Sequence, residues 1–170
     1  MNKLLRLYTT VLEVVMAAGL AVMVVLVFGN VVLRYVFDTG IAVSEELSRW
    51  IFVWVTFLGA IVAMREHAHL GTDALVARLP RAGKVACLVV GYVLMIGTCG
   101  LLLSGSLEQT QINWDVSAPS SGAPVAIFYA SGVVFAVSAI LIMLYDLYRL
   151  ATGKVATQDL IIVRESEEEL

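Results

Sequence analysis

The fold of this chain is decided near its centre, where residues 44–64 read SEELSRWIFVWVTFLGAIVAM. As a helix this run measures about 31 Å, which matches the hydrocarbon thickness of a bilayer. Its first two turns nevertheless carry two carboxylates and a guanidinium, at Glu45, Glu46 and Arg49. Charge is costly inside a membrane, by about 2.5 to 3.5 kcal/mol per group at a helix centre. We therefore expect these residues to be paired, to lie near the interface, or to contact a partner.

The composition indicates an integral membrane protein. Of the 170 residues, 60% are hydrophobic and 15% are charged, and the mean hydropathy is +0.91, which no ordinary soluble domain shows. The net charge of −3 gives no sign of nucleic-acid binding, and no glycine-rich phosphate loop is present in the sequence. Membrane lipid is thus an expected partner, and we expect no cofactor.

Four apolar segments are long enough to cross a bilayer as helices. These expected spans are residues 11–33, 45–64, 85–106 and 123–144. We expect an all-α integral membrane fold in which residues 1–150 form a domain of four transmembrane helices, packed as a bundle. A short amphipathic helix is expected on the membrane surface at about residues 72–79, and residues 151–170 are expected to form a polar, acidic cytoplasmic tail.

The central helix has a specific expected beginning and an expected packing side. Ser44 is placed to cap the helix, and carboxylates in the first turn are favoured by the helix dipole. Glu45 and Arg49 are spaced for an ion pair four residues apart. Small and polar residues recur with them at helical spacing, and in lipid such residues mark the side that packs on other helices. This stripe consists of Glu45, Arg49, Phe52, Thr56, Gly59 and Ala63.

Neither catalysis nor metal binding is indicated. Cys87 and Cys99 lie about 18 Å apart on one helix, too far for a disulfide, and we expect them to be packing residues. His67 and His69 have no converging ligands, so we expect no metal site and place them in a loop or at an interface. No histidine lies inside an expected span, where it could activate a nucleophile or hold a haem.

The basic residues predict the topology. Nine of the eleven Lys and Arg residues fall in the N-terminal segment, the connection after the second span, and the C-terminal segment. Only Arg34 and Arg49 fall on the other side or within a helix. Because positive charge is retained in the cytoplasm, we expect both termini there.

The central stretch resembles the small integral-membrane (Q) subunit of tripartite ATP-independent periplasmic (TRAP) transporters. The matching residues are NVVLRY at 30–35, EEL at 45–47, Trp54, FLGA at 57–60, AMR at 63–65, His69, Asp73 and LP at 79–80. The resemblance is strong over about the first 80 residues. This chain departs from the family pattern at one point. Where the family usually has a glycine before the histidine, this chain has Glu66, His67 and Ala68.

The resemblance implies a non-enzymatic role in transport. It implies a large multi-span subunit that moves substrate by an elevator mechanism, a soluble periplasmic substrate-binding protein, and ion-driven uptake of an organic acid, such as a C4-dicarboxylate, keto acid or sialic acid. The small subunit would extend the static scaffold in the bacterial inner membrane. The residues that we expect to have structural or subunit-interface roles are Arg34, Glu45, Glu46, Arg49, Trp54, Gly59, Arg65, His69 and Asp73.

Other four-span classes fit less well. A small proton-coupled drug or metabolite exporter needs a membrane-embedded glutamate, for which Glu13 is the candidate, but the sided distribution of basic residues favours one fixed orientation. A disulfide-forming quinone oxidoreductase needs periplasmic cysteine pairs, which Cys87 and Cys99 do not supply. A haem-binding electron-transfer subunit needs histidines within its spans.

Overall fold

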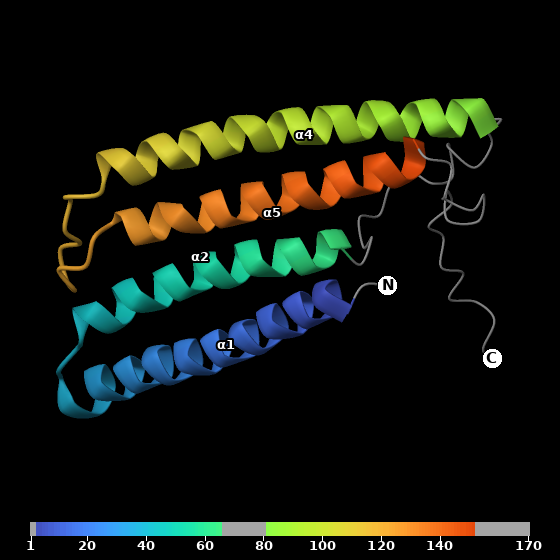
Figure 1. The fold of residues 1–170 in the computed structure, drawn as a ribbon. Helices are drawn as coiled ribbons and strands as arrows, with labels where there is room; N and C mark the ends of the chain where they lie inside the picture. Colours follow the sequence, from blue (N-terminus) through green and yellow to red (C-terminus); the bar gives the residue numbers. More distant parts are fainter. Residues whose placement is uncertain (1–2, 66–80, 152–170) are drawn as a thin grey trace, which may run out of the picture.

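The computed structural model describes residues 3–65 and 81–151, which form four α-helices. The helices are α1 (Lys3–Phe37), α2 (Ala42–Arg65), α4 (Arg81–Ile112) and α5 (Ala126–Ala151) (Figure 1). All four are long and apolar enough to cross a membrane. The predicted class, an all-α integral membrane protein with four transmembrane helices, is confirmed. The surface helix expected at residues 72–79 and the tail beyond residue 151 lie outside the described residues.

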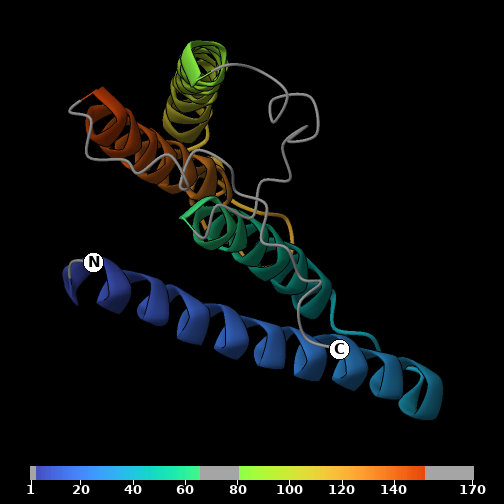
Figure 2. The same cartoon turned by 90° about the vertical axis from the view of Figure 1, so that its right-hand side faces the viewer.

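The helices lie in a single row in the order α1, α2, α5, α4 (Figures 1 and 2). In the most apolar window of each helix, 28% of the residues of α5 and 17% of those of α2 are buried, against 6% in both α1 and α4. The two middle helices therefore hold the row together, and α1 and α4 are its edges. The described helices therefore form an open row.

Two clusters of buried side chains join the row. The first joins α1 to α2 through Leu12, Leu58, Ile61 and Val62, and Phe135 of α5 packs against it. The second joins α4 to α5 through Cys99, Ala139 and Met143. The sequence prediction for the cysteines holds in part, because both are free thiols but only Cys99 is buried.

Helix α5 packs closely on α4 because its contact side carries small residues. Ala136 and Ala139 are both fully buried. A Cβ added at Gly132 would lie 2.5 Å from the Ser106 Oγ of α4, so the two backbones approach too closely for any larger residue without a shift. Small residues at contacts are the usual means by which helices associate in lipid.

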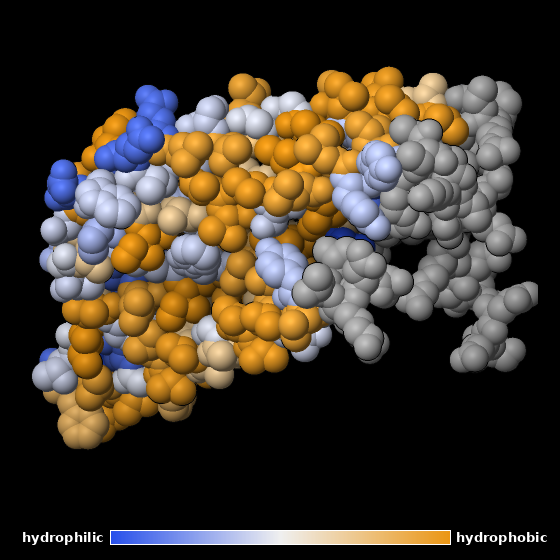
Figure 3. Space-filling view, viewed as in Figure 1, coloured by the Kyte–Doolittle hydropathy of each residue, from blue (hydrophilic) through white to orange (hydrophobic). Residues whose placement is uncertain are grey.

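The row has two distinct ends. We call the end that carries the α1–α2 turn and the α4–α5 connection the hairpin end, and the opposite end, where α1 begins and α5 finishes, the terminal end (Figure 1). Between them the visible face is largely hydrophobic (Figure 3). The edge helices α1 and α4 are about 52 and 48 Å long, which exceeds the roughly 30 Å hydrocarbon core, so they must tilt or project from it.

At the hairpin end, one helix begins at a different residue from the one expected. Helix α1 stops at Phe37, and Asp38 follows in the left-handed region with φ of 48°, a conformation that a short polar side chain tolerates. Pro124 lies within the fourth span expected at residues 123–144, but it precedes α5, which begins at Ala126. It pairs with Ser117 in an isolated β-bridge, because the connection forms its own short hairpin before the helix begins.

Candidate functional site

Two consecutive glutamates at the start of α2 organise the hairpin end. Successive residues on an α-helix point about 100° apart, so Glu45 and Glu46 reach toward different neighbours. Glu45 interacts with α1, whereas Glu46 interacts with the connection between α4 and α5. The start of α2 is thus tied to both sides of the row.

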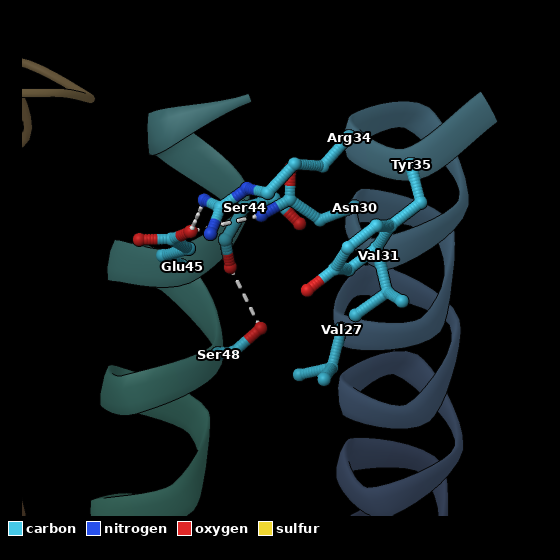
Figure 4. Close-up of a pocket in the computed structure, with 8 residues that line it drawn as sticks. All are labelled: Val27, Asn30, Val31, Arg34, Tyr35, Ser44, Glu45 and Ser48. Carbon is cyan, nitrogen blue, oxygen red and sulfur yellow. Dashed lines mark hydrogen bonds and ion pairs between the residues drawn. The ribbon is translucent and has the colours of Figure 1, made fainter. Parts of the chain in front are cut away.

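Glu45 is held by two side chains of α1 (Figure 4). Arg34 forms an ion pair with its carboxylate, and the Asn30 Nδ2 donates to Glu45 Oε1 over 3.1 Å. The Oδ1 of the same asparagine accepts from the backbone N–H of Ile41 at 2.8 Å, and Asn30 is itself buried. The Asn30 amide therefore fixes both the turn and the start of α2. The expected pair between Glu45 and Arg49 is not formed.

Beside the ion pair, one buried serine of α2 bonds to α1 and a second bonds within α2. Ser44 Oγ donates to the carbonyl of Leu26 in α1 at 2.8 Å, and Ser48 Oγ donates to the Ser44 carbonyl at 2.7 Å. Both serines are buried. The prediction that Ser44 caps the helix is wrong, because α2 already begins at Ala42 and the hydroxyl is used between helices.

Glu46 receives the connection between α4 and α5. Its carboxylate accepts from the backbone N–H of Ser120 at 3.0 Å and from the hydroxyl of Ser121. In the sequence, Ser120 and Ser121 belong to a Ser-Ser-Gly run, which is typical of a turn. A signal was present, since a serine-rich turn offers several donors to a carboxylate, but nothing in it specified which carboxylate.

A pocket of about 220 Å³ opens between α1 and α2 at this corner (Figure 4). It is lined by Val27, Asn30, Val31, Arg34, Tyr35, Ser44, Glu45 and Ser48. Arg34 and Glu45 are 59% and 51% exposed, so the ion pair forms the rim. Because the two charges neutralise each other, the rim offers no net charge to a charged solute. Among the residues that the structure describes, no group of His, Cys, Asp or Glu could hold a metal ion.

Arg49 lies on the outside of the row. It is exposed, two turns into α2, and nothing in the described chain is bonded to it. The stripe expected to pack on other helices is likewise mostly exposed, with Phe52 56% accessible. The bulky face of α2 packs inward instead, as the fully buried Ile61 shows.

The remaining predicted residues serve the packing of α2 at separate places. Trp54 donates its indole N–H to the carbonyl of Ile127 in α5 at 3.1 Å. Gly59 lies beside α1, where an added Cβ would be 3.5 Å from Met16 Sδ. At the terminal end, Arg65 donates to the buried Thr9 hydroxyl. His69 and Asp73 lie outside the described residues.

The chain matches the family model described as "Tripartite ATP-independent periplasmic transporters, DctQ component" over residues 23–153. The chain belongs to the DctQ family. The match runs through all of α4 and α5, well beyond the first 80 residues in which the sequence resemblance is strong. The predicted membership in the TRAP small subunits is confirmed.

Relatives agree with this assignment. A TRAP transporter small permease protein of Haemophilus influenzae is 40% identical over 144 residues, covering 84% of this chain and 89% of the relative. A second from that organism is 31% identical over 147 residues, covering 86% and 89%. The C4-dicarboxylate TRAP transporter small permease protein DctQ of Vibrio cholerae is 31% identical over 94 residues, covering 51% and 40%. As a DctQ member with four apolar helices, the chain is a multi-pass inner-membrane subunit of a transporter, and the family is not an enzyme family.

Proposed function

We propose that this DctQ protein is the fixed scaffold of its transporter and carries no substrate site of its own. The observation that carries the proposal is the use of the polar side chains at the hairpin end. Glu45, Glu46, Asn30 and Arg34 all bind other parts of the same chain. Groups committed to holding helices together are poorly suited to bind and release a solute.

The open row suits a scaffold. Transport by an elevator mechanism needs a wide, anchored body against which another domain moves. A row of four helices presents a broad, largely apolar face and long edges to its surroundings (Figures 1 and 3). The large multi-span subunit and the soluble periplasmic binding protein are the partners of this proposal. The distribution of basic residues supports cytoplasmic termini, which puts the hairpin end on the periplasmic side.

The proposed transported solute is an organic acid, of the C4-dicarboxylate, keto acid or sialic acid class, taken up with an ion gradient such as that of sodium. The name of the Vibrio cholerae relative supports the first class. Specificity would reside in the partner chains, because the polar pocket between α1 and α2 is neutralised by its own ion pair.

Reconstitution in liposomes tests the scaffold role. We expect uptake of labelled organic acids only when this chain, the large subunit and the binding protein are all present. Omitting this chain should abolish uptake, and this chain alone should be inactive. Solute uptake or proton-coupled efflux by the chain alone would contradict the proposal, the latter in favour of an exporter.

A further inference from the structure

One side of α2 remains uncovered by the rest of the chain. At 100° per residue, four exposed side chains fall within an arc of about 60° on the helix. We call this set the α2 outward stripe, and it consists of Arg49, Phe52, Thr56 and Ala63. Gly59 contacts α1, and Phe57 stacks against Phe135 of α5 with ring centroids 5.4 Å apart. Helices α1 and α5 thus lie on either side of the stripe.

Arg49 makes this side unlike the other exposed surfaces. It lies about 10 Å along the axis from the start of α2, within a stretch of 24 residues that can cross the membrane. An arginine at such a depth normally pairs with another group or faces protein or water. Both carboxylates within about one turn of it are engaged elsewhere, Glu45 by Arg34 and Asn30 and Glu46 by the serines of the α4–α5 connection. A carboxylate that pairs with Arg49 would therefore come from outside the described chain.

The neighbours of Arg49 in the stripe favour a helix as the source of that charge. Thr56 and Ala63 are small enough for close approach of another helix, which is how helices associate in lipid. Phe52, which is 56% exposed and lies between Arg49 and Thr56, supplies one large apolar contact. The exposed sides of the edge helices offer mainly Val and Leu, such as Val25 and Leu94, which gain little by exchanging lipid for a helix.

We propose that the α2 outward stripe is the surface on which a transmembrane helix of the large subunit packs, with a carboxylate placed opposite Arg49. This inference rests on the proposed function and adds to it the contact surface and the charge of the partner. The guanidinium would be paired on assembly, Phe52 would be covered, and Thr56 and Ala63 would set a short distance between the helices.

Photo-crosslinking in cells that co-express the tagged large subunit and the binding protein tests the surface. Phe52 is replaced by photoreactive benzoylphenylalanine, and matched controls carry it at Leu94 on α4 or Val25 on α1, which are 65% and 70% exposed. We expect an adduct with the large subunit from position 52 and not from the controls. Adducts with the large subunit only from position 94 or 25 would overturn the proposal. So would adducts from position 52 with a second copy of this chain or with lipid alone.

Arg49 variants test the charge. Arg49→Leu should lower the amount of large subunit that co-purifies with the chain by about tenfold, whereas Arg49→Lys should retain most of it. The melting temperature of the Arg49→Leu chain alone in detergent should not fall, because Arg49 bonds to nothing in the described chain. Full co-purification of Arg49→Leu would overturn the inference and leave the scaffold role intact. Failure of the unsubstituted chain to bind the large subunit would overturn the scaffold role as well.

Discussion

At the scale of single residues, the structure depends on side chains that each form hydrogen bonds with two different parts of the chain. Asn30 donates to Glu45 and accepts from the Ile41 backbone, and it is 7% exposed. An amide is suited to this position because it offers a donor and an acceptor on one short, uncharged group. A carboxylate there would keep the contact with Ile41 but would oppose Glu45.

Asn30→Ala tests this role. We expect a loss of about 1 to 3 kcal/mol in the free energy of unfolding, because the Ile41 N–H loses its acceptor in a partly buried turn. Asn30→Asp should be at least as damaging, since it adds a second carboxylate beside Glu45. Thermal unfolding in detergent measures both. Gln111→Ala, at an exposed position on α4, is the control and should change little. Equal stability of the Asn30 and Gln111 variants would contradict the assignment.

At the scale of helices, the contact between α4 and α5 depends on small side chains that let the backbones meet. Gly132 is the tightest point, where an added Cβ would be 3.3 Å from Ser106 Cβ as well as close to its hydroxyl. Gly100 of α4, by contrast, has open space where its Cβ would be. The two glycines therefore separate the effect of packing from the effect of glycine on helix stability.

The prediction for this contact uses that difference. Gly100→Ala should stabilise the chain by up to about 1 kcal/mol through helix propensity. Gly132→Ala should instead destabilise it, by roughly 1 to 3 kcal/mol before the gain in propensity, because the added methyl group overpacks the contact. Ser106→Gly combined with Gly132→Ala should recover part of the loss. Thermal unfolding of the four proteins is the measurement, and equal effects at the two glycines would argue against close packing.

At the scale of the whole molecule, the open row predicts which helices can be joined covalently. After replacement of Cys87 and Cys99, the double variant Phe57→Cys with Phe135→Cys should be joined between α2 and α5 by a short bis-maleimide, because the two rings lie with centroids 5.4 Å apart. A pair at Val25 on α1 and Leu101 on α4, the two edges, should not. Mobility on denaturing gels and mass spectrometry of the linked peptides give the result. A crosslink between α1 and α4 within one chain would indicate a closed bundle.

The sequence predicts the four helices well, but it does not predict which side of each helix packs against the others. Long apolar runs predict the four helices because a helix satisfies its own backbone in lipid. The stripe that includes Arg49 was expected to pack on other helices, yet within this chain the bulky side of α2 is buried. The reason is physical: in a bilayer both sides of a helix can be apolar, so polarity alone does not say which side the chain covers.

The charged corner shows a second limit. Glu45 and Arg49 are spaced for a pair along one helix, yet Glu45 binds Arg34 across the turn. Spacing along a helix can be read directly, whereas the approach of Arg34 depends on how α1 ends at Phe37 and turns through Asp38. The contact of Glu46 with Ser120 spans 74 positions and was equally hidden. Such contacts follow from the packing order of the helices.

That packing order has a consequence for how the protein is made. Helix α5 joins α2 to α4, yet it is the last of the described helices to leave the ribosome. Until it is inserted, the nascent chain can form the α1–α2 hairpin, but α4 must wait in the lipid without its main neighbour. Packing of the four helices is therefore completed in a single late step. Insertion of α5 would be the point at which membrane quality control distinguishes a fully packed subunit from one whose α4 still lacks its neighbour.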